Sequence, residues 1–272
     1  MNILMPGKQI QIETFQVMVY SILGEGAWGR TYLVQDLQRK NENGFPCMYA
    51  LKVLKKNAQK KQKTRFKREA EFLLSFKEKY PQLQIPQGLA YDKNQKMLLI
   101  EHIQGKTLDD WLNESGYKHM WYSIEQIAQQ LAYIITTLHN EGIIHRDIKP
   151  SNIIINMVNE KIIITLIDFG LMKSTDEAIT KLTVEGLDFN GTPQYMAPEQ
   201  AYSKDKGTGA ADHFAFGAIM YQLLTGSHPR QKALNKDYEN LIKKIEVVSE
   251  FHDKYEETGI SEIQTALLLK IG

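Results

Sequence analysis

Short apolar segments rich in β-branched and aromatic residues recur between residues 15 and 103, each bounded by turn-forming residues. The pattern predicts strands at residues 17–23, 30–35, 48–54 and 97–103. One segment differs from the others, because residues 60–79 contain neither Gly nor Pro and carry apolar side chains at helical spacing. The first third of the chain is therefore expected to form a sheet with one helix.

The pattern becomes helical after Gly105. Thr107 is a suitable N-cap, with Asp109 and Asp110 in the first turn of the helix that follows. Residues 123–140 place apolar side chains at i, i+3, i+4 and i+7, which predicts an amphipathic helix. The remaining segments are predicted to be strands at residues 153–156 and 161–167, an irregular stretch at 168–199, and helices at 210–224, 238–250 and 261–271.

With 272 residues, 43% of them hydrophobic and 24% charged, the chain has the composition of a folded globular protein. Its formal net charge of +1 argues against a general nucleic-acid binder or membrane-surface binder. Cys47 is the only cysteine, so no intrachain disulfide can form. No signal sequence is recognised at the N-terminus, and no apolar run approaches the ~20 residues needed to span a bilayer. We therefore expect no membrane segment and a reducing, cytoplasmic location.

A glycine-rich segment, Gly24-Glu25-Gly26-Ala27-Trp28-Gly29, lies between two predicted strands. Glycines at 24, 26 and 29 would let the backbone approach phosphate groups closely. The same spacing also occurs in plain hairpin turns, and that alternative stays open for this segment alone. A dinucleotide-binding fold is excluded, because a strand pattern rather than a helix follows the third glycine.

A lysine, Lys52, interrupts the apolar strand at residues 48–54. A lone lysine there is often a solvated or snorkelling side chain. Paired with a glutamate of the following helix, it becomes a fixed cation for phosphate oxygens. Glu69 is the candidate partner, and Glu71 is the alternative on a different helix face.

Two further segments are more specific, namely His145-Arg146-Asp147-Ile148-Lys149-Pro150-Ser151-Asn152 and Asp168-Phe169-Gly170. In phosphoryl transfer one carboxylate orients a hydroxyl, while an amide and a second carboxylate hold metal ions. Asp147, Asn152 and Asp168 supply these groups. Each could separately be a cap or turn residue, but their order after the glycine segment and the strand lysine indicates phosphoryl transfer.

These motifs resemble those of eukaryotic-type (Hanks-type) protein serine/threonine kinase domains, over roughly residues 15–271. The Met196-Ala197-Pro198-Glu199 run and Asp212 match further landmarks of that family, and Lys149 with Gly191-Thr192-Pro193 is similar to its serine/threonine subclass. The resemblance implies an α+β, bilobal fold. Its parts would be an N-terminal extension (1–14), a five-stranded sheet lobe with one helix (about 15–101), a hinge (101–105) and a mainly helical lobe (about 106–272).

The resemblance also implies roles for single residues. Lys52, paired with Glu69, would contact the α- and β-phosphates of ATP, and the loop with Gly24, Gly26 and Gly29 would cover them. Asp147 would be the catalytic base or orient the acceptor hydroxyl, and Lys149 would steady the transferred group. The residues implied to bind Mg²⁺, or Mn²⁺ as an alternative, are Asn152 and Asp168.

For adenine, the resemblance implies a site formed by Ala50 on one side and Ile154 on the other. Backbone groups of Glu101 and Ile103 would bond the adenine edge, with Ile100 at the gatekeeper position. Three residues match members of the apolar stack of active kinases, namely Leu73, His145 and Phe169.

In this family the arginine that precedes the catalytic aspartate, here Arg146, often binds a phosphate on the activation segment. Thr180 and Thr183 are the expected self-phosphorylation sites, followed by Ser174 and Thr175. Thr192 is expected to brace the catalytic loop instead.

The chain departs from the family pattern in a few places. Thr31 replaces a usual valine, and no arginine near the C-terminus matches the usual partner of Glu199. The last helix of the large lobe is expected to be absent. If the partner of Glu199 is not replaced, its carboxylate is left unpaired, and reduced stability is expected. A nucleotide-binding pseudokinase or scaffold is therefore kept as the alternative to an active kinase.

A kinase for small molecules is disfavoured by the run from Gly191 to Glu199, which in the resembled family forms a peptide-docking surface. The residues within these motifs resemble those of bacterial members of the family. We therefore expect a bacterial cytoplasmic signalling kinase, or alternatively one delivered into the cytoplasm of a host cell. The expected partners are proteins that bear Ser or Thr, and no nucleic acid.

Overall fold

The computed structural model describes residues 3–26, 28–115, 121–174, 194–197, 200 and 208–229. Several sequence-based predictions fall outside these residues, namely the helices at 238–250 and 261–271, the absence of a last helix, Thr175, Thr180, Thr183, Thr192 and Glu199. The chain divides into two compact units. Unit 1 comprises the described residues up to Gln104 together with Ile167–Gly170, and unit 2 comprises Gly105–Leu166 and the described residues from Leu171 onward.

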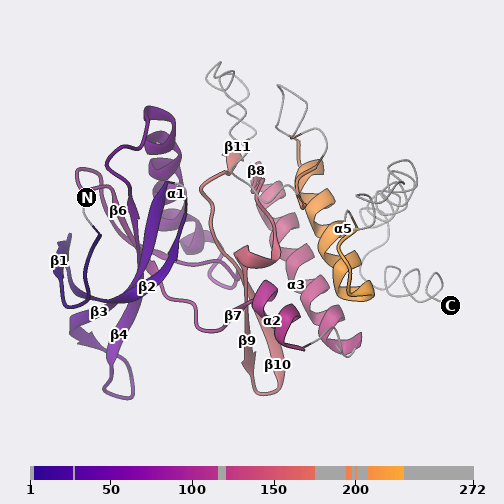
Figure 1. The fold of residues 1–272 in the computed structure, drawn as a ribbon, viewed down its shortest axis with the longest axis horizontal. Coiled ribbons are helices and arrows are strands. Elements are labelled where there is room, and N and C mark those ends of the chain that lie inside the picture. Colours follow the sequence, from indigo (N-terminus) through magenta and orange to yellow (C-terminus); the bar gives the residue numbers. More distant parts are fainter. Residues whose placement is uncertain are drawn as a thin grey trace. The chain divides into compact units, whose positions relative to one another are not determined.

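Unit 1 is a curled antiparallel sheet with one helix along it (Figure 1). The strand order is β1-β2-β3-β4-β6-β5. The strands are β1 (Gln9–Ile12), β2 (Phe15–Glu25), β3 (Gly29–Lys40), β4 (Pro46–Leu54), β5 (Gly88–Asp92) and β6 (Met97–Glu101). The helix, α1 (Lys60–Lys79), has the bounds predicted from the sequence and packs against β5. The α+β fold class is confirmed.

The sheet has six strands where five were predicted, because β1 is formed by residues assigned to the N-terminal extension. Residues 9–12 alternate Gln and Ile, and Ile10 and Ile12 point into the core while the glutamines are exposed. A four-residue alternation is too short to stand out as a strand period in the sequence. Leu4 belongs to the same core, and its backbone N–H donates to the hydroxyl of Tyr32 at 3.2 Å.

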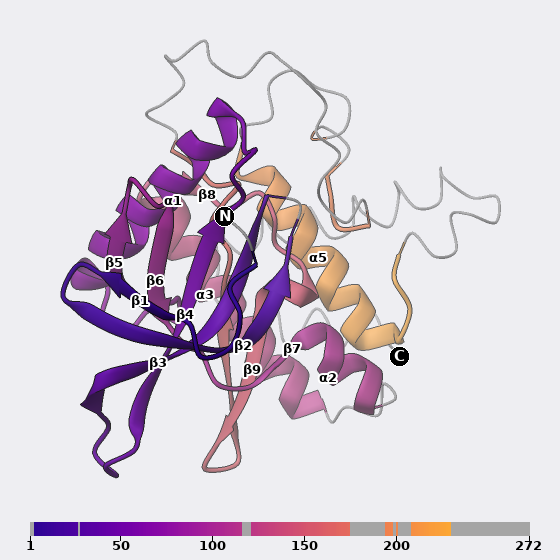
Figure 2. The same cartoon turned by 60° about the vertical axis from the view of Figure 1, so that its left-hand side comes forward.

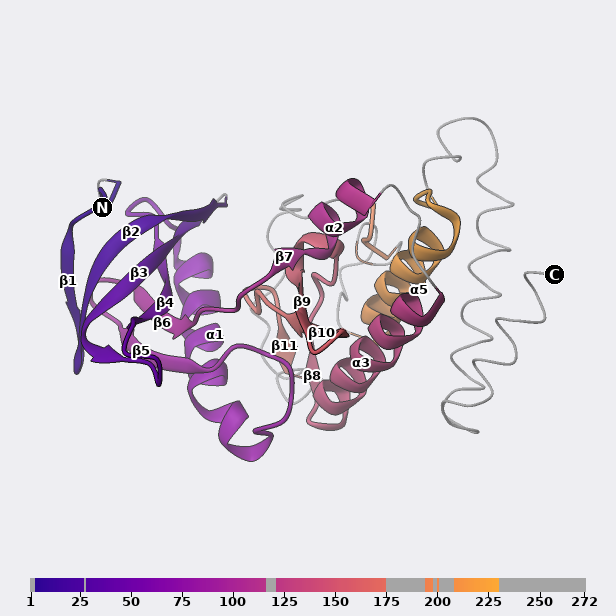
Figure 3. The same cartoon turned by 90° about the horizontal axis from the view of Figure 1, so that it is seen from below.

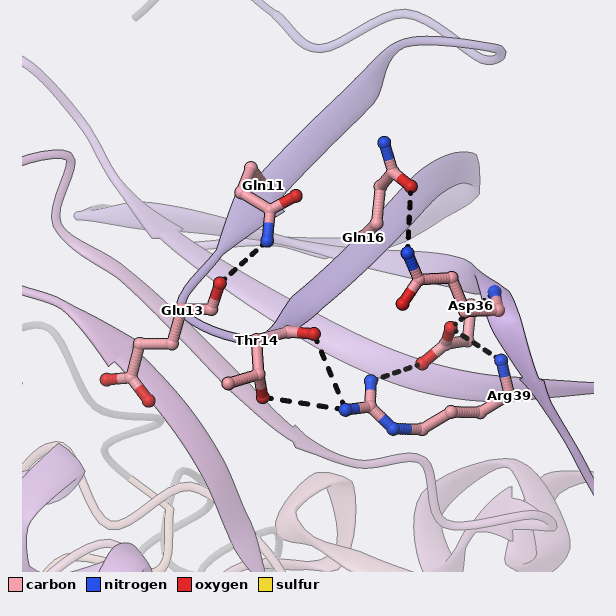
Figure 4. Close-up of polar contacts among 7 residues, drawn as sticks. Gln11, Glu13, Thr14, Gln16, Asp36 and Arg39 are labelled. Carbon is pink, nitrogen blue, oxygen red and sulfur yellow. Dashed lines mark hydrogen bonds and ion pairs between the residues drawn. The ribbon is translucent and has the colours of Figure 1, made fainter.

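Arg39 fastens the turn between β1 and β2 to β3, as Figure 4 shows. Its guanidinium lies 3.2 Å from Oδ2 of the buried Asp36, donates to the Thr14 carbonyl at 3.4 Å, and covers the Phe15 ring at 4.0 Å. Burial alone would raise the pKa of Asp36, but hydrogen bonds from the backbone N–H groups of Arg39 and Gln38 outweigh it and lower that pKa. The residues ahead of β2 are therefore an integral part of unit 1.

Unit 2 contains three described α-helices, one 3₁₀ turn and short strands. The α-helices are α2 (Leu108–Ser115), α3 (Trp121–Asn140) and α5 (Ala210–Thr225), and the 3₁₀ turn is η1 (Pro150–Asn152). The strands are β7 (Lys106–Thr107), β8 (Ile143–Ile144), β9 (Ile153–Val158), β10 (Lys161–Leu166) and β11 (Lys173–Ser174). They form a sheet of order β10-β9-β7 and a pair β11-β8.

Helix α3 is the central element of unit 2, since it packs against both α5 and β10 (Figures 2 and 3). Its apolar stripe is buried as predicted, with Ile127, Leu131 and Leu138 fully enclosed. Helix α2 begins after Thr107, whose hydroxyl oxygen accepts the Asp110 N–H at 3.0 Å, the cap that the sequence predicts. None of the helices in the described ranges is long and apolar enough to cross a bilayer.

Two glutamines of α3 complete the hydrogen bonding of the edge strand β10. Gln130 Nε2 donates to the Ile162 carbonyl at 2.8 Å, and its Oε1 accepts the Ile164 N–H at 3.1 Å. Gln126 Oε1 accepts the Ile162 N–H at 2.9 Å. Because buried backbone groups need partners, these side chains replace the neighbour that β10 lacks on this edge.

Candidate active site

Lys52 and Glu69 form an ion pair within unit 1. Lys52 lies on β4, where its neighbours are buried apolar residues, and Glu69 lies on the buried face of α1. The alternative partner, Glu71, faces solvent instead and pairs with Lys67 at 3.3 Å on the same helix. Of the two glutamates considered from the sequence, the structure thus brings Glu69 to Lys52.

Asp168 contributes a second carboxylate, with its Oδ1 2.9 Å from Lys52 Nζ. Burial would lower the pKa of Lys52, but the charges of Asp168 and Glu69 outweigh burial and raise it, so the side chain stays cationic. Burial is also the largest influence on Glu69 and raises its pKa, with Lys52 acting in the opposite direction. The result is a lysine cation held in a fixed, partly desolvated position between two carboxylates.

The Asp168-Phe169-Gly170 segment is anchored to α1. Phe169 is fully buried, and its ring centroid lies 4.8 Å from that of Phe72. Glu69 accepts a hydrogen bond from the Phe169 backbone N–H. Asp168 itself has a φ of +66°, a left-handed conformation that is costly for a residue with a side chain and is typical of functional positions.

The glycine-rich segment is the turn between β2 and β3, as predicted. Gly26 N–H donates to the Gly29 carbonyl at 3.0 Å, which closes the turn. A Cβ at Gly29 would lie 2.8 Å from the Val53 carbonyl oxygen, so packing alone requires glycine there. A Cβ at Gly24 would meet no atom of the described structure within 4 Å, and one at Gly26 only a carbonyl at 4.0 Å.

The residues predicted to bind adenine lie on two strands of the unit 1 sheet and one strand of unit 2. Ala50 is buried on β4 and pairs with Ile100 of β6. Strand β6 ends at Glu101 rather than at residue 103, so Ile103 lies in the segment that follows. Ile154 is half-buried on β9.

The side chain and N–H of Glu101 are engaged within unit 1. Its N–H donates to the Gln87 carbonyl at 2.8 Å. Its carboxylate accepts from Lys77 Nζ at 2.8 Å and from the Gln87 N–H at 3.2 Å. The predicted adenine contact of Glu101 therefore requires its backbone carbonyl rather than its N–H.

Asp147, Lys149 and Asn152 form a compact group within unit 2. Lys149 Nζ lies 2.8 Å from Asp147 Oδ2, and Asn152 Nδ2 donates to the same oxygen at 3.0 Å and to the Asp147 carbonyl at 2.8 Å. Because the nitrogen of the Asn152 amide is committed to Asp147, its oxygen is the end that can face a cation. This donor set suits Mg²⁺, which prefers oxygen ligands.

Asp212 holds the loop that leads into Asp147. Its carboxylate accepts the backbone N–H groups of His145 at 2.8 Å and Arg146 at 2.7 Å, and it lies 2.9 Å from His139 Nε2. Burial would raise the pKa of Asp212, but the hydrogen bond from His139 and the contacts with His145 and Arg146 lower it. The carboxylate therefore remains charged at neutral pH.

Two residues around this loop were not identified from the sequence. His139 reaches Asp212 from α3, and Gln200 Nε2 donates to the Arg146 carbonyl at 3.1 Å. Gln200 directly follows the Met196-Ala197-Pro198-Glu199 run, which was the available signal. No local pattern pointed to His139, since its contact with Asp212 depends on how α3 and α5 pack.

Comparison with known proteins matches residues 17–270 to the family described as "Protein kinase domain". Ribosomal protein S6 kinase alpha-1 of Rattus norvegicus is 32% identical over 231 residues, covering 83% of this chain and 29% of that protein. Ribosomal protein S6 kinase alpha-3 of Homo sapiens is 30% identical over 237 residues, covering 85% of this chain and 30% of that protein. The chain thus spans about three tenths of the length of these relatives. It belongs to the protein kinase domain family, whose members use ATP and a divalent metal ion.

Proposed function

We propose that this chain is a serine/threonine protein kinase that transfers the γ-phosphoryl group of ATP to hydroxyl groups of protein substrates, itself included. The observation that carries the proposal is the arrangement at Asp147. Its carboxylate is held by Lys149 and Asn152, which come from the same short loop. A carboxylate fixed beside a cation and an amide can accept a hydroxyl proton while the cation stabilises the transferred phosphoryl group.

The residues of unit 1 supply the nucleotide-binding part of the proposed mechanism. Lys52, held by Glu69, would contact the α- and β-phosphates, and the β2–β3 turn would cover them. The glycines support this role, because the protein's own packing does not require glycine at Gly24 or Gly26. A ligand that approaches the backbone closely would require it.

The residues of unit 2 supply the acceptor part. Asp147 would take the proton of the acceptor hydroxyl while the oxygen of that hydroxyl bonds to the γ-phosphorus. The bond from the γ-phosphorus to the bridging oxygen then breaks, and ADP leaves with that oxygen. Lys149 would neutralise charge on the transferred group. Asn152 of unit 2 and Asp168 of unit 1 are the proposed ligands of Mg²⁺, or of Mn²⁺ in its place. A bound ion would offset the negative charge of the triphosphate.

The match to the protein kinase family and the run from Gly191 to Glu199 favour a protein acceptor. A small hollow beside Asp147 has room for about one water molecule and does not by itself select an acceptor. It is lined by Lys149, Tyr195, Met196 and Gln200 among other residues of unit 2. Thr180 and Thr183 are the proposed self-phosphorylation sites. A bacterial origin and a cytoplasmic location stay predictions from the sequence.

The test is transfer from labelled ATP with Mg²⁺ to the protein and to myelin basic protein, followed by phosphoamino-acid analysis. We expect label on Ser and Thr, and its loss in Lys52→Met and Asp168→Ala. Lys67→Met is the matched control, because Lys67 is an exposed lysine on α1 that pairs with Glu71. Label on Tyr alone, or none in the wild type while ATP still binds, would contradict the proposal, and the second result would favour the pseudokinase alternative.

A further inference from the structure

Lys55, the residue directly after β4, contacts the glycine-rich turn with both its backbone and its side chain. Its backbone N–H donates to the Trp28 carbonyl at 2.8 Å. Its Nζ donates to the Gly26 carbonyl at 3.0 Å and lies 3.0 Å from Glu25 Oε1. One residue therefore reaches three successive described positions of the turn.

Glu25 links this contact to the other strand of the hairpin. Glu25 and Arg30 are direct partners in the β2–β3 register, and Arg30 Nε lies 2.8 Å from Glu25 Oε2. The two carboxylate oxygens of Glu25 thus bind one cation each, Arg30 on one side and Lys55 on the other. Hydrogen bonds from Arg30 and then from Lys55 lower the pKa of Glu25, so the carboxylate is charged throughout the neutral range.

The turn needs such restraint because of its composition. Glycine has more backbone freedom than any other residue, and a segment with three glycines in six positions loses much of it when a ligand orders the segment. A contact that already orders the turn reduces this loss on binding. Backbone and side-chain contacts from one residue to both sides of Ala27 restrain the turn more than a pair of surface charges would.

We propose that Lys55 is a positioning residue that holds the glycine-rich turn in its nucleotide-binding conformation before ATP arrives. The inference rests on the proposed function, since it assumes that ATP phosphates bind beneath this turn. It does not make Lys55 a phosphate ligand, because the contacts that carry it are to Glu25 and to the carbonyl groups of Gly26 and Trp28.

Trp28 provides a reporter within the turn. The 272-residue chain with Trp111→Phe and Trp121→Phe keeps Trp28 as its single tryptophan. Time-resolved fluorescence anisotropy of Trp28 then measures the mobility of the turn, and its intensity follows an ATP titration. The variants are Lys55→Met, Lys55→Arg, and the control Lys56→Met, which removes the adjacent exposed lysine.

In the absence of nucleotide we expect lower Trp28 anisotropy in Lys55→Met than in the parent. The Kd for ATP should rise about two- to fivefold, as for loss of an exposed ion pair, with a matching rise in KM for ATP and kcat within about twofold. Lys55→Arg should retain most of the parental behaviour, and Lys56→Met all of it.

Equal anisotropy and equal Kd in Lys55→Met and Lys56→Met would overturn the inference and leave the proposed function intact. A weaker Kd without any change in anisotropy would also overturn it, because Lys55 would then act on ATP directly. If the parent protein does not respond to ATP at all, the proposed function fails, and the anisotropy without nucleotide still decides whether Lys55 orders the turn.

Discussion

The backbone N–H of Arg146 donates a 2.7 Å hydrogen bond to Oδ1 of Asp212, a residue 66 positions later in the chain. Arg146 has a φ of +70°, in the left-handed region that a non-glycine residue occupies only at a cost of order 1–3 kcal/mol. The buried carboxylate on α5 offsets that cost and fixes the backbone directly ahead of Asp147. The conformation of the loop is thus imposed by a helix rather than by its own sequence.

Replacing Asp212 with Asn should loosen this loop. The Asn amide has one acceptor oxygen in place of two. Its NH₂ group, a donor, would face one of the two backbone N–H groups of His145 and Arg146, which are donors too. We expect unfolding free energy to fall by about 1.5–3 kcal/mol, as for hydrogen bonds to a charged group. Chemical denaturation measures this loss, and an unchanged midpoint in the variant would contradict the assigned contacts.

The pH dependence of the unfolding free energy, measured for wild type and for Asp212→Asn, tests whether Asp212 stabilises the fold through its charge. Because folding lowers the pKa of Asp212, its stabilising contribution is complete above the ordinary value of 3.8 and is lost as pH falls through the lower folded value. The stability difference between wild type and Asp212→Asn should therefore shrink below about pH 4. A difference that stays constant down to pH 3 would show that the carboxylate is not the stabilising group.

Glu69→Gln should lower the catalytic rate. The variant keeps the shape of the side chain but removes the charge that positions Lys52, so kcat should fall by up to about a hundredfold from misplacement of a catalytic group. Glu71→Gln is the control on the same helix, since Glu71 pairs with the exposed Lys67. Steady-state kinetics with ATP would show the contrast, and equal rates in the two variants would contradict the role of Glu69.

The residues ahead of β2 should contribute to folding although the family match begins at residue 17. Ile12 is 1% exposed and lies in the core of unit 1, whereas Ile3 is 51% exposed. Ile12→Ala should cost roughly 2–5 kcal/mol of unfolding free energy, and Ile3→Ala within about 0.5 kcal/mol. Similar losses in both variants would mean that β1 does not belong to the cooperative core.

Gln130→Leu should remove hydrogen-bond partners from the backbone of the edge strand β10. It leaves the Ile162 carbonyl and the Ile164 N–H without the partners they have in the structure, at a cost of about 1–3 kcal/mol. Hydrogen exchange at the Ile164 amide should accelerate. Gln129→Leu breaks only a bond to Glu125 on the same helix and is the control. No difference in exchange between the two variants would refute the pairing.

The sequence predicts the parts of the site that depend on residue type and order. The Lys52–Glu69 pair follows from a lysine in an apolar strand and a glutamate on the next helix, and the bounds of α1 follow from its uninterrupted helical period. Contacts to backbone groups could not be predicted. The Trp28 and Gly26 carbonyls that bind Lys55, and the Arg146 carbonyl that binds Gln200, would be the same atoms in any residue.

Strand β1 was missed for a related reason, because a four-residue alternation becomes a strand only when β2 pairs with it. The role of His139 likewise depends on the packing of α3 against α5, which no local pattern encodes. Local periodicity therefore predicted the longer elements, whereas the short strands β5, β7, β8 and β11 were also not predicted. Long-range pairing decided the edges of the sheet and the supports of the loop.

In the proposed function, Asp147 acts on the acceptor hydroxyl during phosphoryl transfer. Asp147→Asn preserves the size of the side chain and removes the carboxylate that Lys149 and Asn152 hold. The most direct measurement is single-turnover transfer from labelled ATP to a protein acceptor, beside an ATP-binding titration of the same variant. We predict ATP binding within about threefold of wild type and a transfer rate lower by about 10²–10⁴. Transfer at the wild-type rate by Asp147→Asn would contradict the account.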